Sequence, residues 1–262
     1  MTPRIDERAR DGVRLAFVRA GCGPALMFIH GNACDHTHFG PQIEHFAATH
    51  TVVAVDLRGH GASDAPEGGY GFAGWADDCA WLCAELGLAP VTVVGHSMGG
   101  MIAVEFADRH PEQTKAVAAL DSSLLFDHHR QRVLLPPILA GLQGTEWREH
   151  LEAFFKPLFG PWLDRAEVER ILARIARTPR HVLVANFHAL TGWDGRAALE
   201  ALKRPFFYLA GGQGWRHPPA ELKAACPQAL TAQTALSGHF VTTEVPRQVN
   251  AMLGRFLALA AA

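Results

Sequence analysis

The sequence predicts an α/β fold in which a mostly parallel β-sheet carries helices on both faces and is interrupted by an inserted helical lid. Short apolar runs typical of buried strands alternate with helix-period segments through both ends of the 262-residue chain. Between residues 124 and 203 this alternation stops, and only helical patterns remain. Near residue 97, a strand-like run, a G-x-S-x-G segment and a helical pattern follow one another. Repeated alternation of strands and helices is typical of a parallel sheet covered on both sides.

The first part of the chain supplies most of the predicted sheet. Apolar runs predict strands at residues 14–19, 25–29, 51–55, 91–94 and 115–120. Helical spacing predicts helices at residues 40–49, 73–86 and 101–109. The second of these helices has one apolar face, formed by Ala76, Cys79, Ala80, Leu82, Cys83 and Leu86.

The last part of the chain returns to the pattern of the sheet. Strands are predicted at residues 205–209 and 230–235, and an amphipathic helix at residues 245–259 has Pro246 in its first turn. We therefore expect a core formed by residues 1–123 and 204–262 and a lid formed by residues 124–203.

The predicted lid consists of helical stretches at residues 128–135, 145–158, 165–177 and 180–190. Its aromatic side chains are Phe154, Phe155, Phe159, Trp162, Phe187 and Trp193. A helical insertion between two strands of the sheet would lie over the site. These aromatics are therefore candidates either for lining a pocket or for packing within the lid.

Composition and charge exclude several classes of partner. The chain is 48% hydrophobic and 19% charged, with a net charge of −2, as in an ordinary globular protein. The scattered charges form no basic segment of the kind that nucleic-acid binding needs. No stretch approaches the ~20 apolar residues of a membrane span. The first eight residues are polar and lack the apolar segment of a signal peptide. The sequence does not indicate an oligomeric state.

The five cysteines favour a reducing, cytoplasmic location, because their number is odd and they form no disulfide framework. Cys79 and Cys83 lie four residues apart on a predicted helix, where two small core residues are expected rather than metal ligands. Neither a G-x-G-x-x-G segment nor a cluster of ligands at metal-binding spacing is present, so no cofactor and no metal are predicted.

Residues 95–99, G-H-S-M-G, predict a nucleophile at Ser97. The segment follows the apolar run at residues 91–94 and precedes a helical pattern, which is the context of a nucleophile elbow. In such a tight turn a Cβ at the flanking glycines would collide with the neighbouring strand and helix. The chain is therefore expected to perform covalent chemistry through Ser97.

A nucleophilic serine requires a base, and His239 is the candidate. Among fifteen histidines, His239 stands out because it follows the last predicted strand, in the segment S-G-H-F, and precedes the final helix. This position brings its loop to the same edge of the sheet as Ser97.

The chain resembles the α/β-hydrolase superfamily, in particular lidded serine esterases and C–C hydrolase-like members. Residues 28–32, F-I-H-G-N, resemble the H-G oxyanion loop, and residues 55–64, V-D-L-R-G-H-G-A-S-D, match the D-x-R-G-x-G-x-S turn. Residues 94–100 match the elbow. The pair Gly238 and His239, followed by Glu244 and Pro246, matches the histidine loop.

This resemblance implies a role for each matching residue. Ser97 attacks a carbonyl carbon, and His239 takes its proton. The backbone N–H groups of Met98 and Asn32 form the oxyanion hole. His30 is implied to be structural, packing under the oxyanion loop, and His96 to shape the pocket.

Beside these roles, the sequence leaves two further assignments open. His30, His96 and Trp193 are candidate residues of the substrate pocket. Asp35 and His36 form either a helix N-cap or a pocket wall.

The acid of the triad departs from the usual pattern of the family. Residues 210–217, A-G-G-Q-G-W-R-H, occupy its common position and contain no carboxylate, although Gln213 could orient an imidazole. Some members place the acid after the preceding strand, where this chain has Asp121. Asp121 is therefore the candidate by elimination, and the alternative is an aspartate that only caps the loop. Asp56 and Asp64 are expected to hold the turn near residue 59, and Glu244 to cap the closing helix.

The resemblance predicts a serine hydrolase that cleaves a small or medium carboxylic ester or lactone through an acyl-enzyme on Ser97. C–C bond hydrolysis uses the same triad and stays open. A second hypothesis is a cofactor-independent dioxygenase of a heteroaromatic ring with the His239/Asp121 pair as base, which the pair Asp35 and His36 also fits. A third is a ligand-binding protein that keeps the fold. In each case the partner is a small molecule.

Overall fold

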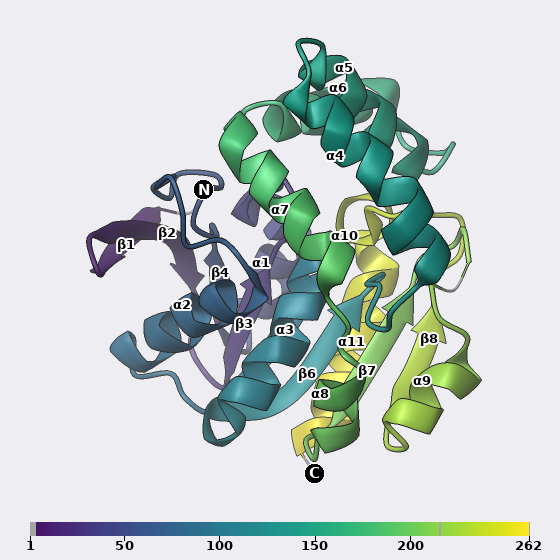
Figure 1. Ribbon diagram of the computed structural model, residues 1–262. Helices are drawn as coiled ribbons and strands as arrows, with labels where there is room; N and C mark the ends of the chain where they lie inside the picture. Colours follow the sequence, from purple (N-terminus) through teal and green to yellow (C-terminus); the bar gives the residue numbers. More distant parts are fainter. Residues whose placement is uncertain (1–3, 215, 262) are drawn as a thin grey trace.

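The computed structural model describes residues 4–214 and 216–261 and contains one eight-stranded sheet (Figure 1). In spatial order its strands are β1 (Ile5–Arg10), β2 (Val13–Ala20), β4 (Thr51–Val55), β3 (Ala25–Ile29), β5 (Val91–His96), β6 (Thr114–Leu120), β7 (Phe206–Ala210) and β8 (Leu230–Gln233). The first two pairings are antiparallel, and the pairings from β4 to β8 are parallel. The predicted mostly parallel sheet is confirmed.

Helices cover both faces of the sheet and create two hydrophobic cores. On one face lie α2 (Phe72–Glu85) and α3 (Met98–Arg109), which contact each other, and on the other lie α1 (Gly40–Phe46) and α11 (Pro246–Ala261) (Figure 1). Alternate residues of β3 belong to different cores: Met27 packs in the first and Phe28 in the second. This alternation follows from the two-residue period of a strand, so β3 is apolar throughout.

The segment between β6 and β7 contains no strand among the described residues and forms a group of helices beyond one end of the sheet (Figure 1). Its elements are the π-helical turn η3 (Arg130–Leu134), α4 (Leu135–Gln143), α5 (Trp147–Phe155), η4 (Lys156–Leu158), α6 (Arg165–Ile175), α7 (Arg180–Gly192) and α8 (Arg196–Ala201). The short helix α8 lies away from the others and contacts α3 and α9 (Pro219–Ala225). The division into core and lid stays a prediction, and its ends at residues 1–3 and 262 lie outside the described residues.

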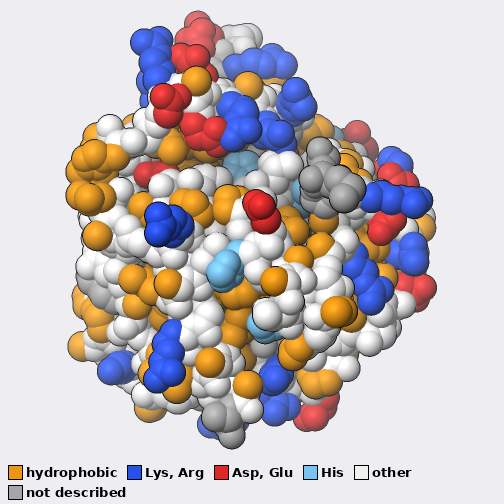
Figure 2. Space-filling model, turned by 180° about the vertical axis from the view of Figure 1, so that it is seen from behind, with side chains coloured by type: hydrophobic (Ala, Val, Ile, Leu, Met, Phe, Trp, Pro, Cys, Tyr) orange, Lys and Arg blue, Asp and Glu red, His pale blue; other side chains and the backbone are white. Residues whose placement is uncertain are grey.

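Charged side chains of both signs crowd the top of the molecule, where these helices lie (Figure 2). On α6 they form ion pairs one turn apart, such as Arg165 with Glu169 and Arg170 with Glu167. Within residues 4–214 and 216–261, no helix has the length and the apolar character that crossing a membrane requires.

Several elements differ from the predictions for physical reasons. The strand β1 was not predicted because its sequence, I-D-E-R-A-R, is largely exposed, as suits the charged edge of a sheet. The helices α8, α9 and α10 (Val241–Glu244) are too short to show a helical period. The stretch predicted as a helix at residues 128–135 is helical throughout but includes the π-helical turn η3, and the helix continues as α4, which accommodates Pro136 and Pro137 in its first turn.

The packing of α3 against the sheet leads to a prediction about two helical glycines. A Cβ on Gly99 would lie 2.0 Å from the carbonyl oxygen of Ile29, whereas a Cβ on Gly254 would have its nearest neighbour, in Phe46, at 3.9 Å. We expect Gly99→Ala to lower the free energy of unfolding by about 1–3 kcal/mol or more, because backbone must move. Gly254→Ala should raise it by up to about 1 kcal/mol, through helix propensity. Thermal unfolding measures both, and equal shifts in the two variants would contradict the described contact.

Candidate active site

Ser97 occupies a strained turn between β5 and α3. Its backbone has φ of 55° and ψ of −120°, a conformation that is costly for a residue with a side chain. Gly95 and Gly99 flank it, and a Cβ on Gly95 would lie 2.0 Å from the Gly99 carbonyl oxygen. The backbone N–H of Ser97 donates to the Leu120 carbonyl at the end of β6, which fixes the turn on the sheet. These contacts are those of a nucleophile elbow.

Three predicted residues meet at the carboxyl ends of the strands. The distance from Ser97 Oγ to His239 Nε2 is 2.9 Å, and His239 Nδ1 lies 2.6 Å from Asp121 Oδ2. Because an ionised carboxylate only accepts, the imidazole donates its Nδ1–H to Asp121, which leaves Nε2 to accept the Ser97 hydroxyl. Ser97 follows β5, Asp121 follows β6, and His239 follows β8. The parallel sheet therefore brings together residues that are far apart in the sequence.

Asp121 is held as an anion inside the protein. Its side chain is 2% exposed, and its backbone has φ of 44°. Burial alone would raise the pKa of Asp121, but hydrogen bonding to His239, the charge of Arg216 and the N–H of Gly211 lower it below its usual range. Gly211 N donates to Asp121 Oδ1 at 2.9 Å. The loop after β7, which lacks a carboxylate, thus supplies a donor to the carboxylate after β6.

Arg216 is a member of this cluster that the sequence patterns did not reveal. Its Nη2 lies 3.0 Å from Asp121 Oδ2 and 3.2 Å from His239 Nδ1. Burial lowers the pKa of His239, and Arg216 lowers it further, against the opposing effect of Asp121. The charge of Asp121 is therefore shared between an imidazole and a guanidinium. The sequence indicated Arg216 only as a positively charged residue in the loop at residues 210–217, where related proteins carry the acid.

The predicted oxyanion donors border the same cavity. Asn32 and Met98 line it together with Ser97 and His239. Met98 is the first residue of α3, where backbone N–H groups lack intrahelical partners. The Asn32 side-chain oxygen accepts from Asn186 of α7 at 2.8 Å, so the side chain is engaged by the inserted helices. The oxyanion role of the two N–H groups stays a prediction.

None of the three candidate pocket residues lines this cavity. His30 is fully buried and accepts the Leu57 N–H at 3.0 Å, below the oxyanion loop. His96 Nε2 lies 2.8 Å from the His239 carbonyl oxygen and supports the histidine loop. Trp193 donates from Nε1 to Glu105 at 3.2 Å and packs on Phe72. The imidazole of His96 stays neutral, because burial and the neighbouring His239 lower the pKa of His96 to about 3.

The cavity around Ser97 has a volume of about 150 Å³ and two kinds of wall. The inserted helices supply an apolar wall, formed by Leu135, Phe154, Phe155, Leu158 and Leu190. Arg130 and Arg216 supply a cationic wall. Of the candidate aromatics of the insertion, Phe154 and Phe155 line this cavity, which is one of the two alternatives left open for them. A cavity of this volume suits a compact ligand.

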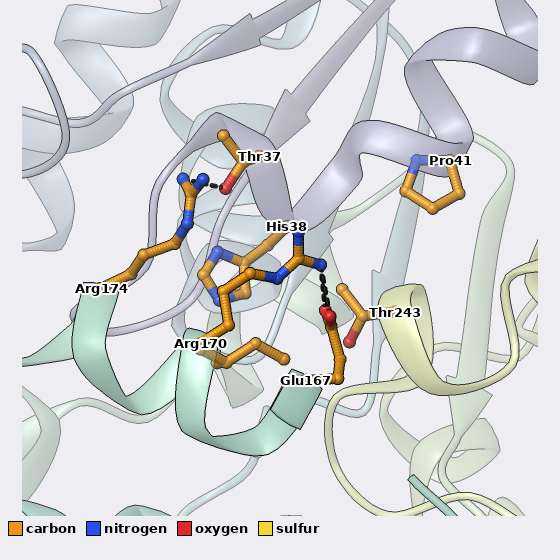
Figure 3. A pocket seen from close by; sticks show the side chains of 8 residues that line it. Thr37, His38, Pro41, Glu167, Arg170, Arg174 and Thr243 are labelled. Atoms are coloured by element: carbon orange, nitrogen blue, oxygen red, sulfur yellow. Dashed lines mark hydrogen bonds and ion pairs between the residues drawn. The ribbon is translucent and has the colours of Figure 1, made fainter. Parts of the chain in front are cut away.

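A second cavity, of about 310 Å³, lies between the 3₁₀ helix η1 (His36–Phe39) and α6 (Figure 3). It is larger than the Ser97 cavity, but its cations are already paired. Arg170 pairs with Glu167, and Arg174 donates to the Thr37 hydroxyl at 2.7 Å. Neither Ser97 nor His239 is among its lining residues, whereas both line the smaller cavity.

The pair Asp35 and His36 is structural in its contacts. Asp35 accepts the Thr37 N–H at 2.9 Å and so caps η1, as the N-cap assignment predicted. His36 Nδ1 lies 2.8 Å from Asp56. Both residues line a separate cavity that does not include Ser97.

The remaining acidic residues have clear partners. Asp56 accepts the Ala62 N–H at 2.9 Å and so holds its turn as predicted. Asp64 contacts the turn only through its backbone carbonyl, which accepts the Gly59 N–H, while its carboxylate accepts from Arg14 of β2. The prediction for Glu244 was wrong. Instead of capping α11, its carboxylate accepts the N–H groups of Gly160, Gly238 and Phe240. It therefore ties the loop of His239 to the inserted helices, an arrangement that no local pattern reveals.

The predicted core role of the two helical cysteines agrees with their placement. Cys79 and Cys83 are buried in the first hydrophobic core, and burial raises the pKa of Cys83 to about 12. Throughout residues 4–214 and 216–261, no group of three or more His, Cys, Asp or Glu side chains is arranged to hold a metal ion.

A family model described as "alpha/beta hydrolase fold" matches residues 24–180. The chain belongs to this family. Among curated proteins it is 30% identical to the dihydrolipoyllysine-residue acetyltransferase component of the acetoin cleaving system of Cupriavidus necator, over 94% of this chain and 67% of that protein. It is 34% identical to 2-(acetamidomethylene)succinate hydrolase of Mesorhizobium japonicum, over 51% of this chain and 48% of that protein. The match with three uncharacterized mycobacterial proteins, at 40% identity, spans 42% of this chain and 32% of their length.

Solved structures agree over nearly the whole chain. A thermophilic esterase from Thermogutta terrifontis superposes with a TM-score of 0.86 and 25% identity, covering 99% of this chain and 100% of that one. The enol-lactonase from Burkholderia xenovorans LB400 has a TM-score of 0.83 at 23% identity, covering 97% of this chain and 100% of that one. At 23% identity, the similarity to the enol-lactonase shows a shared fold and no more.

The position of Arg216 leads to a prediction about the protonation of His239. Replacing Arg216 by glutamine removes a cation beside Nδ1 and leaves Asp121 to the imidazole alone, so the pKa of His239 should rise. Protonation would then occur at a higher pH, and a base that acts in its neutral form would lose activity earlier as the pH falls. NMR titration of the His239 ring measures this midpoint. Arg255→Gln, on the exposed side of α11, is the control, and an unchanged midpoint in Arg216→Gln would contradict the prediction.

Proposed function

We propose that the protein is a serine hydrolase that cleaves a small carboxylic ester or lactone through an acyl-enzyme on Ser97. The observation that carries this proposal is the hydrogen-bonded series Ser97–His239–Asp121, with distances of 2.9 and 2.6 Å, at one wall of a small cavity. A serine hydroxyl becomes nucleophilic when a base accepts its proton and a third group orients that base.

In the acylation step, Ser97 Oγ attacks the carbonyl carbon while its proton passes to His239 Nε2. The carbonyl oxygen becomes an oxyanion, which the N–H groups of Met98 and Asn32 and the N-terminus of α3 are proposed to stabilise. The C–O bond to the alcohol then breaks, and His239 returns the proton to the leaving oxygen. In the second half, His239 takes a proton from water, which attacks the acyl carbon. The bond between this carbon and Ser97 Oγ then breaks, and His239 returns the proton to Oγ, which releases the acid and the free serine.

Asp121 stabilises the imidazolium that forms in both halves of the reaction. Its charge is available because burial and hydrogen bonds keep it ionised, but Arg216 takes part of it. The base should therefore be weaker than an imidazole whose carboxylate partner has no second cation. A weaker base is also less protonated at neutral pH, so more of the enzyme is in the competent form.

The comparisons support hydrolysis over ring dioxygenation and over ligand binding without catalysis. The whole chain superposes on a named esterase, and two curated relatives are named as hydrolases of succinate derivatives. C–C bond hydrolysis uses the same residues and is a variant of this proposal. The dioxygenase hypothesis loses one of its two supports, because Asp35 and His36 do not line the cavity of Ser97.

The segment at residues 124–203 is proposed to act as a lid over the reaction. Leu135, Phe155 and Leu190 from this segment form part of the cavity wall, so they would exclude water from the acyl-enzyme. The partner is proposed to be a small molecule, in agreement with the cavity volume of about 150 Å³.

Replacing the nucleophile should abolish both covalent labelling and turnover. We expect wild-type protein to gain the mass of a fluorophosphonate probe on Ser97 and to cleave short-chain esters, and Ser97→Ala to do neither. Ser123→Ala is the matched control because Ser123 is a second serine in the same cavity, and it should keep the label. Turnover that survives in Ser97→Ala would exclude the acyl-enzyme.

Replacing the acid should slow the reaction strongly. Asp121→Asn should lower kcat by roughly 10⁴-fold, because the amide cannot stabilise the imidazolium by charge and favours the wrong tautomer. Asp77→Asn, which removes a half-buried partner of Arg109 elsewhere, should leave kcat within about twofold. A loss of less than about tenfold in Asp121→Asn, equal to ~1.4 kcal/mol, would reject Asp121 as the acid.

A further inference from the structure

Arg130 is a guanidinium in the Ser97 cavity whose side chain has no anionic partner among the described residues. It lines the cavity from the π-helical turn η3, a type of turn that is frequent at functional sites. The nearby carboxylate of Asp127 accepts the backbone N–H of Arg130 through Oδ1 at 3.0 Å. The side chain of Arg130 forms no ion pair with any residue in the described ranges.

The other arginines around the two cavities are engaged. Arg216 pairs with Asp121 at 3.0 Å, Arg174 with Asp35 at 3.3 Å, and Arg170 with Glu167. Among the described residues that line the Ser97 cavity, Arg130 is therefore the arginine whose guanidinium is available to bind a ligand. The other side chains that line this cavity are mostly apolar, and Asp121, the one carboxylate among the described lining residues, already has His239, Arg216 and the Gly211 N–H as partners.

The environment of Arg130 favours an anion beside it. Burial and the charge of Arg216 lower the pKa of Arg130 to about 10 against the opposing charge of Asp127, so Arg130 is largely desolvated and still protonated at neutral pH. Two cations that face one cavity repel each other, and this repulsion is relieved when an anion binds between them. A carboxylate matches the planar fork of a guanidinium through two parallel hydrogen bonds.

We propose that the site selects esters or lactones whose acyl or alcohol part carries a free carboxylate, and that Arg130 binds this carboxylate while Ser97 attacks the ester. This inference rests on the proposed hydrolase function and names the substrate class of the same site. The volume of about 150 Å³ suits a short chain, such as a monoester of a four-carbon dicarboxylic acid.

Two substrates of equal shape test the proposal: monomethyl succinate, which carries the carboxylate, and methyl succinamate, in which a neutral amide replaces it. We expect wild-type protein to show a kcat/KM about 10- to 100-fold higher for the acid, as a charge-assisted contact implies. Arg130→Gln should reduce this ratio to about one. The ratio is informative even if the variant is less active, because a general loss affects both substrates alike.

Arg132→Gln is the matched control, because Arg132 lies in the same turn but its side chain is exposed and contacts Phe126. It should keep the full preference for the acid. A wild-type ratio near one, or a ratio that Arg130→Gln leaves unchanged, would overturn the proposal while the cleavage of both esters upholds the hydrolase function.

A binding measurement separates this inference from a failure of the proposed function. If neither ester is cleaved and Ser97 takes no fluorophosphonate, the hydrolase proposal fails. Calorimetry of monomethyl succinate with Ser97→Ala then decides whether Arg130 binds a carboxylate. Binding that weakens about tenfold or more in the double variant Ser97→Ala/Arg130→Gln supports a carboxylate site at Arg130. The absence of binding, or equal binding by both variants, contradicts it.

Discussion

The close approach of α3 to the sheet at Ser97 is the constraint on which the site depends. A Cβ at Gly95 or Gly99 would lie 2.0 Å from a backbone oxygen, so the elbow forms only with glycine at both positions. This tight turn holds the Ser97 side chain over the carboxyl ends of the strands. It also starts α3 there, whose first N–H groups lack intrahelical partners and are the proposed oxyanion donors. The same turn therefore determines both the position of the Ser97 side chain and the position of the N-terminus of α3.

The sheet brings Asp121 and His239 close to Ser97. Because β5, β6, β7 and β8 run parallel, the loops that follow them meet at one edge. Each loop is then secured separately. Gly211 N donates to Asp121, and Glu244 accepts three N–H groups from the histidine loop and the inserted helices. The position of His239 thus depends on a carboxylate that takes no part in the proposed chemistry.

The sequence was sufficient wherever a pattern was local. Buried strands such as β3 and β4 have continuous apolar runs, and their bounds match the prediction. Ser97 and His239 lie in short motifs with a fixed place in the fold. The polar edge strand β1 and the three contacts of Glu244 were missed, because both depend on what lies opposite in space. The ion pair of Arg216 with Asp121 joins positions 95 residues apart, so no spacing rule could reveal it.

Moving the carboxylate from the loop after β7 to the end of β6 changes the electrostatics of the whole cavity. The loop after β7 carries Arg216, whose Nη2 lies 3.0 Å from Asp121 Oδ2. Arg130 from η3 lines the same cavity, so two guanidinium groups and one carboxylate are among its described lining residues. The two cations repel each other in a partly desolvated site, and a bound carboxylate would relieve this repulsion. The proposed selectivity for a substrate that carries a carboxylate would therefore follow from the presence of an arginine in the loop where related proteins carry the acid.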